Sequence, residues 1–142
     1  MLSGCGSFDA EEMFGLHATP SNRGDVRALR GGKVSCLHCP MYFAFETENA
    51  LTGKIIVGNH LRPTTELNRN IRQIIDLVSR EAAWWEMTNP AAQDKVFWVE
   101  YKAERPGLDP MAFRLLIVRG KQSFFITSGY FNPADYVLVN PA

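Results

Sequence analysis

The stretch LNRNIRQIIDLVSREAAWWEMTNP, residues 67–90, is the strongest structural signal in this sequence. Its apolar residues recur at the spacing that places side chains on one stripe of an α-helix, and they are Leu67, Ile71, Ile74, Ile75, Val78, Ala82 and Trp85. Thr64 or Thr65 can cap the start, and Pro90 stops the helix because it disfavours helical geometry at the preceding residue. The pattern predicts one long amphipathic helix from about Thr65 to Met87.

After this helix the apolar period changes to two, which is typical of β-strands. The predicted strands are residues 96–102, 113–118, 123–127 and 136–139, and the upstream apolar runs 34–45 and 54–57 indicate further strands or a loose hairpin. Strands joined by short connections, such as the one at residues 119–122, pair antiparallel. We therefore predict an α+β fold in which the helix packs on an antiparallel sheet of three to five strands.

The beginning of the chain lacks such a period. Six of the 11 glycines fall within the first 32 residues, among Ser, Asn and Asp. This composition predicts an irregular arm, flexible or loosely attached, over residues 1–32, followed by a single α+β domain over residues 33–142. The short run Leu2-Ser3-Gly4-Cys5 matches a bacterial lipidation box, but the apolar segment that must precede such a box is missing, which favours a chance match.

The overall composition excludes several classes of protein. With 46% hydrophobic and 21% charged residues, the chain has the content of a globular domain. Lys and Arg number 15, as do Asp and Glu, so a basic coat for nucleic acid and an acidic DNA mimic are both excluded, although a local basic cleft is not. No run approaches the length of a membrane span. Three cysteines are too few for a disulfide scaffold and favour a reducing compartment. We expect action in the cytoplasm, whether the protein is made there or delivered by another cell or a virus.

Metal and cofactor motifs are weak. Cys36, His38 and Cys39 have zinc-ligand spacing, and His60 is the one plausible distant ligand, but no second pair follows. Cys36 and Cys39 are also explained as two small hydrophobic residues of the core. A catalytic cysteine at either position would need His60 nearby as its base. Phosphate loops, dinucleotide fingerprints, serine elbows and zinc-peptidase motifs are missing. We therefore expect neither stoichiometric zinc nor a cofactor.

A few polar residues stand among apolar ones. In a hairpin that turns at Gly120 and Lys121, Arg114 and Thr127 become cross-strand neighbours on one face of the sheet. An arginine beside hydroxyls suits an anion such as phosphate. Metal-free cleavage of RNA by its own 2′-hydroxyl needs a base, a cation and an acid.

These requirements assign the predicted catalytic roles. His60 becomes the candidate base or acid, Arg114 the charge stabiliser, and Thr127 or Tyr130 the partner of a phosphate oxygen. Arg62, Lys121 and Ser128 become candidate RNA contacts. The structural alternatives are a capping role for His60 and a cross-strand pair of Arg114 with Glu100.

The layout from Ile55 onward, with His60, then the helix, then FRLLIV (residues 113–118), a turn and FFITSGY (residues 124–130), resembles the barnase, EndoU, colicin and RelE group of ribonucleases. The likeness covers about 85 residues. It implies a metal-independent, toxin-like endoribonuclease of bacterial or phage origin that a cognate inhibitor neutralises. A second histidine, which EndoU has, and a barnase-type acidic base are not evident.

The competing interpretation is a non-enzymatic protein-binding module, such as a phage or mobile-element inhibitor of a host protein. Its sequence support is the zero net charge and the pair Trp84-Trp85, of which one ring must lie off the apolar stripe of the helix. An exposed tryptophan is a common anchor at protein interfaces. The oligomeric state stays open.

Overall fold

The computed structural model describes residues 9–17, 26–34, 40–46, 49–65, 69–85, 90, 93–107, 111–128 and 132–139. Three α-helices, a short 3-10 helix and seven β-strands lie within this part of the chain. In chain order they are α1 (Ala10–His17), β1 (Arg27–Lys33), β2 (Met41–Glu46), α2 (Asn49–Gly58), β3 (Arg62–Thr64), α3 (Arg69–Glu81), β4 (Lys95–Ala103), β5 (Met111–Arg119), β6 (Gln122–Thr127), the 3-10 helix (Pro133–Asp135) and β7 (Tyr136–Leu138).

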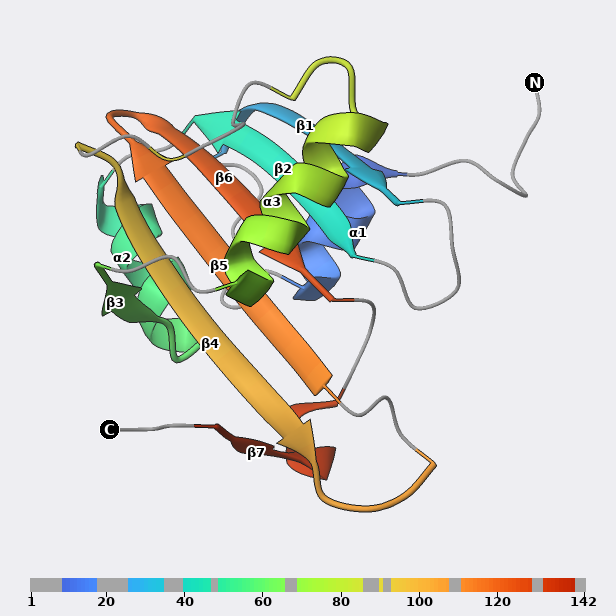
Figure 1. The fold of residues 1–142 in the computed structure, drawn as a ribbon. Helices are drawn as coiled ribbons and strands as arrows, with labels where there is room; N and C mark the ends of the chain where they lie inside the picture. The colour runs from blue at the N-terminus through green and yellow to red at the C-terminus, as the bar shows by residue number, and fades with distance from the viewer. Residues whose placement is uncertain are drawn as a thin grey trace.

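All strands belong to one antiparallel sheet in the order β1-β2-β6-β5-β4-β3 (Figure 1). One edge of β4 pairs with β5, and two short strands share its other edge. β3 pairs with residues 96–98 and β7 with residues 101–103. The central hairpin β5-β6 and its neighbours β2 and β4 therefore form the body of the sheet.

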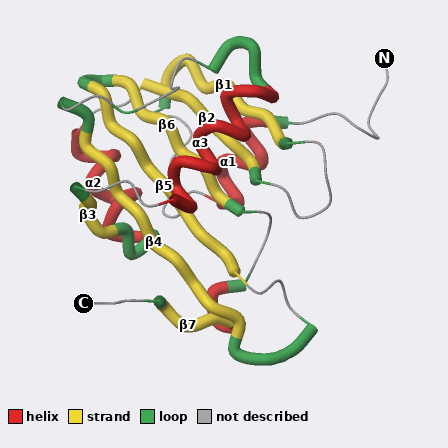
Figure 2. The backbone as a smooth tube through the Cα atoms, viewed as in Figure 1, coloured by secondary structure: helices red, strands yellow, loops and turns green. Residues whose placement is uncertain are grey.

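The helices cover both faces of the sheet, so the molecule has three layers (Figure 2). On one face, Phe14 of α1 and Leu51 and Ile55 of α2 pack with the side chains of alternate strand residues. On the other face, α3 contributes Ile71, Ile75 and Val78 to a second apolar core. Because successive strand residues point to opposite faces, each central strand supplies both cores.

The central position of β2 and β6 in the sheet explains the apolar runs in their sequences. Met41, Phe43 and Phe45 face the α1 and α2 layer, whereas Tyr42 and Ala44 face α3. A strand that is covered on both faces needs apolar residues at every position rather than at alternate ones. The run from Met41 to Phe45 is therefore the signature of a central strand.

The predicted strands at residues 96–102, 113–118, 123–127 and 136–139 are confirmed as β4, β5, β6 and β7, and their pairings are antiparallel. The predicted packing face of the helix is also confirmed, with Ile71, Ile75 and Val78 buried and Ile74 partly buried. The α+β class is confirmed in this broad form.

The expected length of the helix was wrong, because α3 spans 13 residues and ends at Glu81. Beyond it the backbone turns, with the Trp85 N–H donating to the Ala82 carbonyl at 3.1 Å. Against Tyr42 of β2, the ring of Trp84 is tilted and that of Trp85 is edge-on, each at a centroid distance of 5.7 Å. If the helix continued straight, the two rings would follow the helix axis. Because the backbone turns after α3, both rings lie beside the sheet instead.

Residues 54–57 form part of α2 and not a strand. Ile55, Ile56 and Val57 have high β-propensity, but this preference is weak and tertiary packing overrides it. Leu51 and Ile55 are four residues apart, so a helix places both on the face that covers the sheet, where each is at most 6% exposed.

The prediction of an irregular N-terminal arm was wrong for residues 10–17 and 27–32, which form α1 and most of β1. Phe14 is completely buried and contacts the rings of Phe43, Phe45 and Phe125. The glycines of β1 serve close packing: a Cβ on Gly31 would lie 2.7 Å from Phe43 Cδ1.

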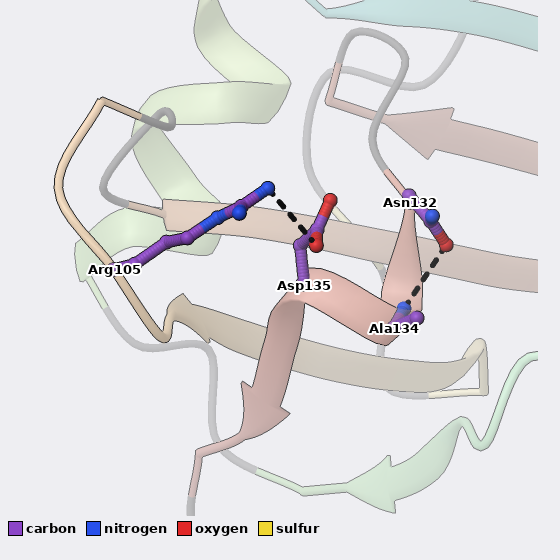
Figure 3. Close-up of polar contacts among 4 residues, drawn as sticks. All are labelled: Arg105, Asn132, Ala134 and Asp135. Carbon is purple, nitrogen blue, oxygen red and sulfur yellow. Dashed lines mark hydrogen bonds and ion pairs between the residues drawn. The ribbon is translucent and has the colours of Figure 1, made fainter.

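The sheet has seven strands instead of the predicted three to five. The additional strands are at its edges, where short, polar or proline-containing segments are common and carry little periodic signal. A compact polar turn precedes β7 (Figure 3). In this turn Asn132 Oδ1 accepts the Ala134 N–H at 3.1 Å, and Arg105 Nη2 lies 3.4 Å from Asp135 Oδ1. Among the residues that the structure describes, every helix is too short or too polar to cross a membrane.

Candidate functional site

The predicted pair of Arg114 and Thr127 is confirmed as a cross-strand pair of β5 and β6. The hairpin turns at Gly120, which has φ of 61°, a backbone conformation that glycine adopts without strain. Both side chains are on the face toward α1 and α2, and both are buried, with 6% of Arg114 and none of Thr127 exposed. The Thr127 hydroxyl donates to the backbone carbonyl of Ser128 at 3.1 Å.

The side chain of Asn59, which the sequence analysis did not single out, binds Arg114. Asn59 Oδ1 accepts a short hydrogen bond from Arg114 Nη1, and its Nδ2 donates to the Ile55 carbonyl at 2.8 Å. The amide therefore joins the end of α2 to the centre of β5. Asn59 is completely buried and His60 has a left-handed backbone conformation. In the sequence, the dipeptide Asn59-His60 was the only sign of this arrangement.

His60 has a backbone role that explains its place in the sequence. It adopts φ of 58°, its N–H donates to the Val57 carbonyl at 3.1 Å, and the Leu61 N–H donates to the Ile56 carbonyl at 2.9 Å. These two bonds and the left-handed residue make a Schellman motif, which terminates α2. The His60 side chain is exposed, whereas its neighbour Asn59 is buried.

Electrostatics around Arg114 follow from its burial. Burial lowers the pKa of Arg114 from its usual value, and the nearby Tyr101 opposes this change. Burial likewise raises the pKa of Tyr101 above its ordinary value, with Arg114 opposing the rise. Tyr101 is on β4, one strand away, and its ring joins the same core. The alternative pair of Arg114 with Glu100 does not form, because the two residues point to opposite faces of the sheet.

Of the remaining predicted site residues that the structure describes, Ser128 lies close to Arg114, whereas Arg62 and Lys121 lie elsewhere. Ser128 is adjacent, but its hydroxyl is used to accept the Phe113 N–H at 3.1 Å. Arg62 is exposed on the edge strand β3, and Lys121 is exposed in the hairpin turn. Lys121 and Thr127 are six positions apart along the β6 arm of the hairpin, which is about 20 Å in a strand. Tyr130 lies outside the described residues.

The metal prediction falls largely outside this part of the chain as well. Cys36, His38 and Cys39 are not among the described residues. Within the described residues, His, Cys, Asp and Glu side chains do not form a group of three or more that would hold a metal ion.

A groove lies on the opposite face of the sheet, between α3 and strands β4 and β5. We call it the α3 groove; its cavity volume is about 360 Å³, and its lining residues are Pro40, Asn70, Gln73, Ile74, Leu77, Trp98, Glu100 and Phe113. Asn70, Gln73, Ile74 and Leu77 are three or four positions apart, so they share one flank of the helix. This flank forms a wall beside the buried stripe of α3.

Two aromatic rings and a carboxylate form the sheet side of the α3 groove. The rings of Trp98 and Phe113 stack with centroids 5.5 Å apart and planes inclined by 20°. Glu100 is directly opposite Phe113 across β4 and β5. The Trp98 Nε1–H donates to Glu100 Oε1 at 3.2 Å. Period-two alternation places Trp98 and Glu100 on the same face, but the sequence does not reveal that α3 leaves this part of the face uncovered.

The tryptophan pair that the sequence analysis proposed as an anchor is packed. Trp85 is 5% exposed and contacts Phe124, whereas Trp84 is half-buried. The guanidinium carbon of Arg30 lies 4.8 Å from the centre of the Trp84 ring. Trp98, by contrast, lines the α3 groove.

No protein-family model matches this sequence, and no curated protein and no solved structure is significantly similar to it. Two places in the fold carry chemistry, the buried polar group around Arg114 and the α3 groove.

Proposed function

We propose that this protein is a non-enzymatic protein-binding module that takes a side chain of its partner into the α3 groove. The supporting observation is the groove itself, whose volume of about 360 Å³ lies in the range of binding pockets. Stacked Trp98 and Phe113 offer a rigid aromatic surface, and tryptophan is enriched among residues that carry binding energy. Such a module suits a phage or mobile-element inhibitor of a host protein.

The accessibility of the two candidate places favours binding over catalysis. Trp98, Phe113 and Glu100 are half-buried and border open space. Arg114 is only 6% exposed and lies beneath the end of α2, to which Asn59 joins it. A phosphate group of RNA reaches this guanidinium only if α2 moves away from the sheet.

A groove-blocking variant tests the proposal. Gln73 is exposed at the mouth of the groove, so Gln73→Trp should fill the groove without disturbing the core. Arg80→Trp is the matched control, because Arg80 is exposed on the same helix, is not among the residues that line the groove and forms an exposed ion pair with Asp76. Partner proteins captured by wild type and by Arg80→Trp, and confirmed by calorimetry with the purified partner, should be lost with Gln73→Trp. Equal binding by Gln73→Trp would contradict the proposal.

A metal-independent ribonuclease is the second candidate function. The observation in its favour is the arrangement of Arg114 and Thr127 side by side with Tyr101 nearby, which is a cation beside hydroxyl groups. In this mechanism the RNA 2′-oxygen attacks the adjacent phosphorus, and the bond from phosphorus to the leaving 5′-oxygen breaks, which gives a 2′,3′-cyclic phosphate and a 5′-hydroxyl. Arg114 stabilises the developing charge, and His60 either takes the proton of the 2′-hydroxyl as the base or gives a proton to the leaving 5′-oxygen as the acid. A cognate inhibitor would protect the producing cell.

The ribonuclease candidate has its own test. The purified protein should cleave RNA in EDTA, leave a 2′,3′-cyclic phosphate and spare DNA. Arg114→Ala or His60→Ala should reduce the rate on the order of 100- to 1000-fold. Lys121→Ala should have little effect, because Lys121 is at the other end of the hairpin. Intact RNA after prolonged incubation with folded wild type would eliminate this candidate.

A further inference from the structure

The chemistry of the α3 groove indicates which side chain it accepts. Its sheet side combines an aromatic stack with one carboxylate, and its helix side carries the amides of Asn70 and Gln73. Among the described residues that line the groove, Glu100 is the one that carries a charge. An incoming group must therefore pack on apolar rings and at the same time satisfy a carboxylate that it removes from water.

A hydrogen bond from Trp98 orients the Glu100 carboxylate, and a backbone hydrogen bond fixes Glu100 on β4. The indole N–H of Trp98 donates to its Oε1, and the backbone carbonyl of Glu100 accepts the Val139 N–H at 2.8 Å. A carboxylate accepts about four hydrogen bonds, so one bond from Trp98 leaves room for a second donor. A fixed acceptor beside an aromatic surface favours a ligand that is flat, positively charged and rich in N–H groups.

Three kinds of side chain can be compared. An apolar or aromatic side chain packs on Trp98 and Phe113 but leaves the Glu100 carboxylate desolvated, which costs free energy. A lysine ammonium is a compact, strongly hydrated charge that does not stack. An arginine guanidinium is planar, stacks on aromatic rings and presents paired N–H donors to a carboxylate. Charge and shape complementarity therefore single out arginine.

We propose that the α3 groove binds the guanidinium group of an arginine side chain from a partner protein, stacked on Trp98 and Phe113 and hydrogen-bonded to Glu100. This inference rests on the proposed binding function and names its chemistry. The same kind of contact already occurs within the chain, where Arg30 lies over the ring of Trp84 at 4.8 Å.

Small capped amino acids separate this inference from its alternatives. The probes are the N-acetyl amides of arginine, citrulline, lysine and phenylalanine, where citrulline keeps the planar shape without the charge. The readout is the NMR signal of the Trp98 indole N–H, which Trp98→Phe assigns among the three tryptophans of the chain. The arginine probe should shift this signal with a Kd on the order of millimolar, and the citrulline and lysine probes should bind about tenfold more weakly.

Substitution of the carboxylate completes the test. Glu100→Gln should abolish the preference for arginine over citrulline, whereas Glu104→Gln, an exposed change outside the groove, should preserve it. Equal binding of arginine and citrulline by wild type, or an unchanged preference in Glu100→Gln, would overturn the inference. If only the phenylalanine probe binds, arginine is excluded while the groove remains a binding site. If no probe shifts the Trp98 signal, the inference also fails, and the capture experiment with Gln73→Trp decides the binding function separately.

Discussion

Truncation of Phe14 should reveal whether α1 is an integral part of the fold. The side chain is completely buried, and its ring meets those of Phe45, Phe43 and Phe125 at centroid distances of 4.9, 5.5 and 6.5 Å. Phe→Ala changes at buried positions cost about 3–5 kcal/mol, and edge-to-face ring pairs add to the loss. We expect Phe14→Ala to lower the free energy of unfolding by about 4 kcal/mol, a large part of the roughly 5–15 kcal/mol of a typical domain.

Urea denaturation followed by circular dichroism measures this loss. With a slope of about 2 kcal/mol per molar, the midpoint should fall by about 2 M. Glu11→Ala is the control, because Glu11 is exposed on the same helix and its removal should leave the midpoint nearly unchanged. A loss below about 1 kcal/mol for Phe14→Ala would refute the reasoning, since it would mean that α1 contributes little to the core.

Three further predictions concern the end of α2 and the buried polar group. His60→Gly should raise the free energy of unfolding by about 0.5–1 kcal/mol, because glycine adopts the left-handed backbone with less strain; a loss on thermal denaturation would show that the His60 side chain contributes more than the strain costs. Asn59→Ala should lower the free energy of unfolding by about 1.5–3 kcal/mol, because Arg114 loses the amide oxygen that accepts a hydrogen bond from its Nη1. A denaturant midpoint equal to that of wild type would contradict this prediction. Burial raises the pKa of Tyr101 in the folded state above the ordinary value of 10.0. The contribution of the protonated Tyr101 to the free energy of unfolding is therefore complete below pH 10.0, and it is lost as the pH rises through the raised pKa. Alkaline unfolding should therefore be less steep in Tyr101→Phe, and identical pH profiles of the two proteins would refute the assignment.

The helix α3 and the β5-β6 hairpin could be predicted from local patterns. The 3.6-residue period of Ile71, Ile75 and Val78 is a property of the helix itself, and the register of Arg114 with Thr127 follows from the position of the turn. Local patterns failed where packing opposed propensity. Residues 54–57 are rich in β-branched side chains, yet the sheet needs a helical cover at this place, and Ile55 fills it.

The strand β1 shows the same limit at the edge of the sheet. Its sequence, RALRGGK, has no apolar alternation and only two apolar residues, Ala28 and Leu29, and it is a strand because it pairs with β2. Gly31 and Gly32 allow this close pairing, since a Cβ at either position would collide with Phe43 or Tyr42. Such a requirement is visible only when the neighbouring strand is known.

By itself, the sequence determined the α+β class, the buried stripe of α3 and the cross-strand pair in the hairpin, because each depends on residues that are near in the chain. The tertiary structure alone decided which polar groups meet. Asn59 and Arg114 are 55 positions apart, and their hydrogen bond exists because α2 packs across β5. In the same way, the α3 groove exists because the helix covers the sheet beside Trp98 and Phe113 rather than over them. Contacts between distant segments depend on how whole faces pack, and no local period encodes them.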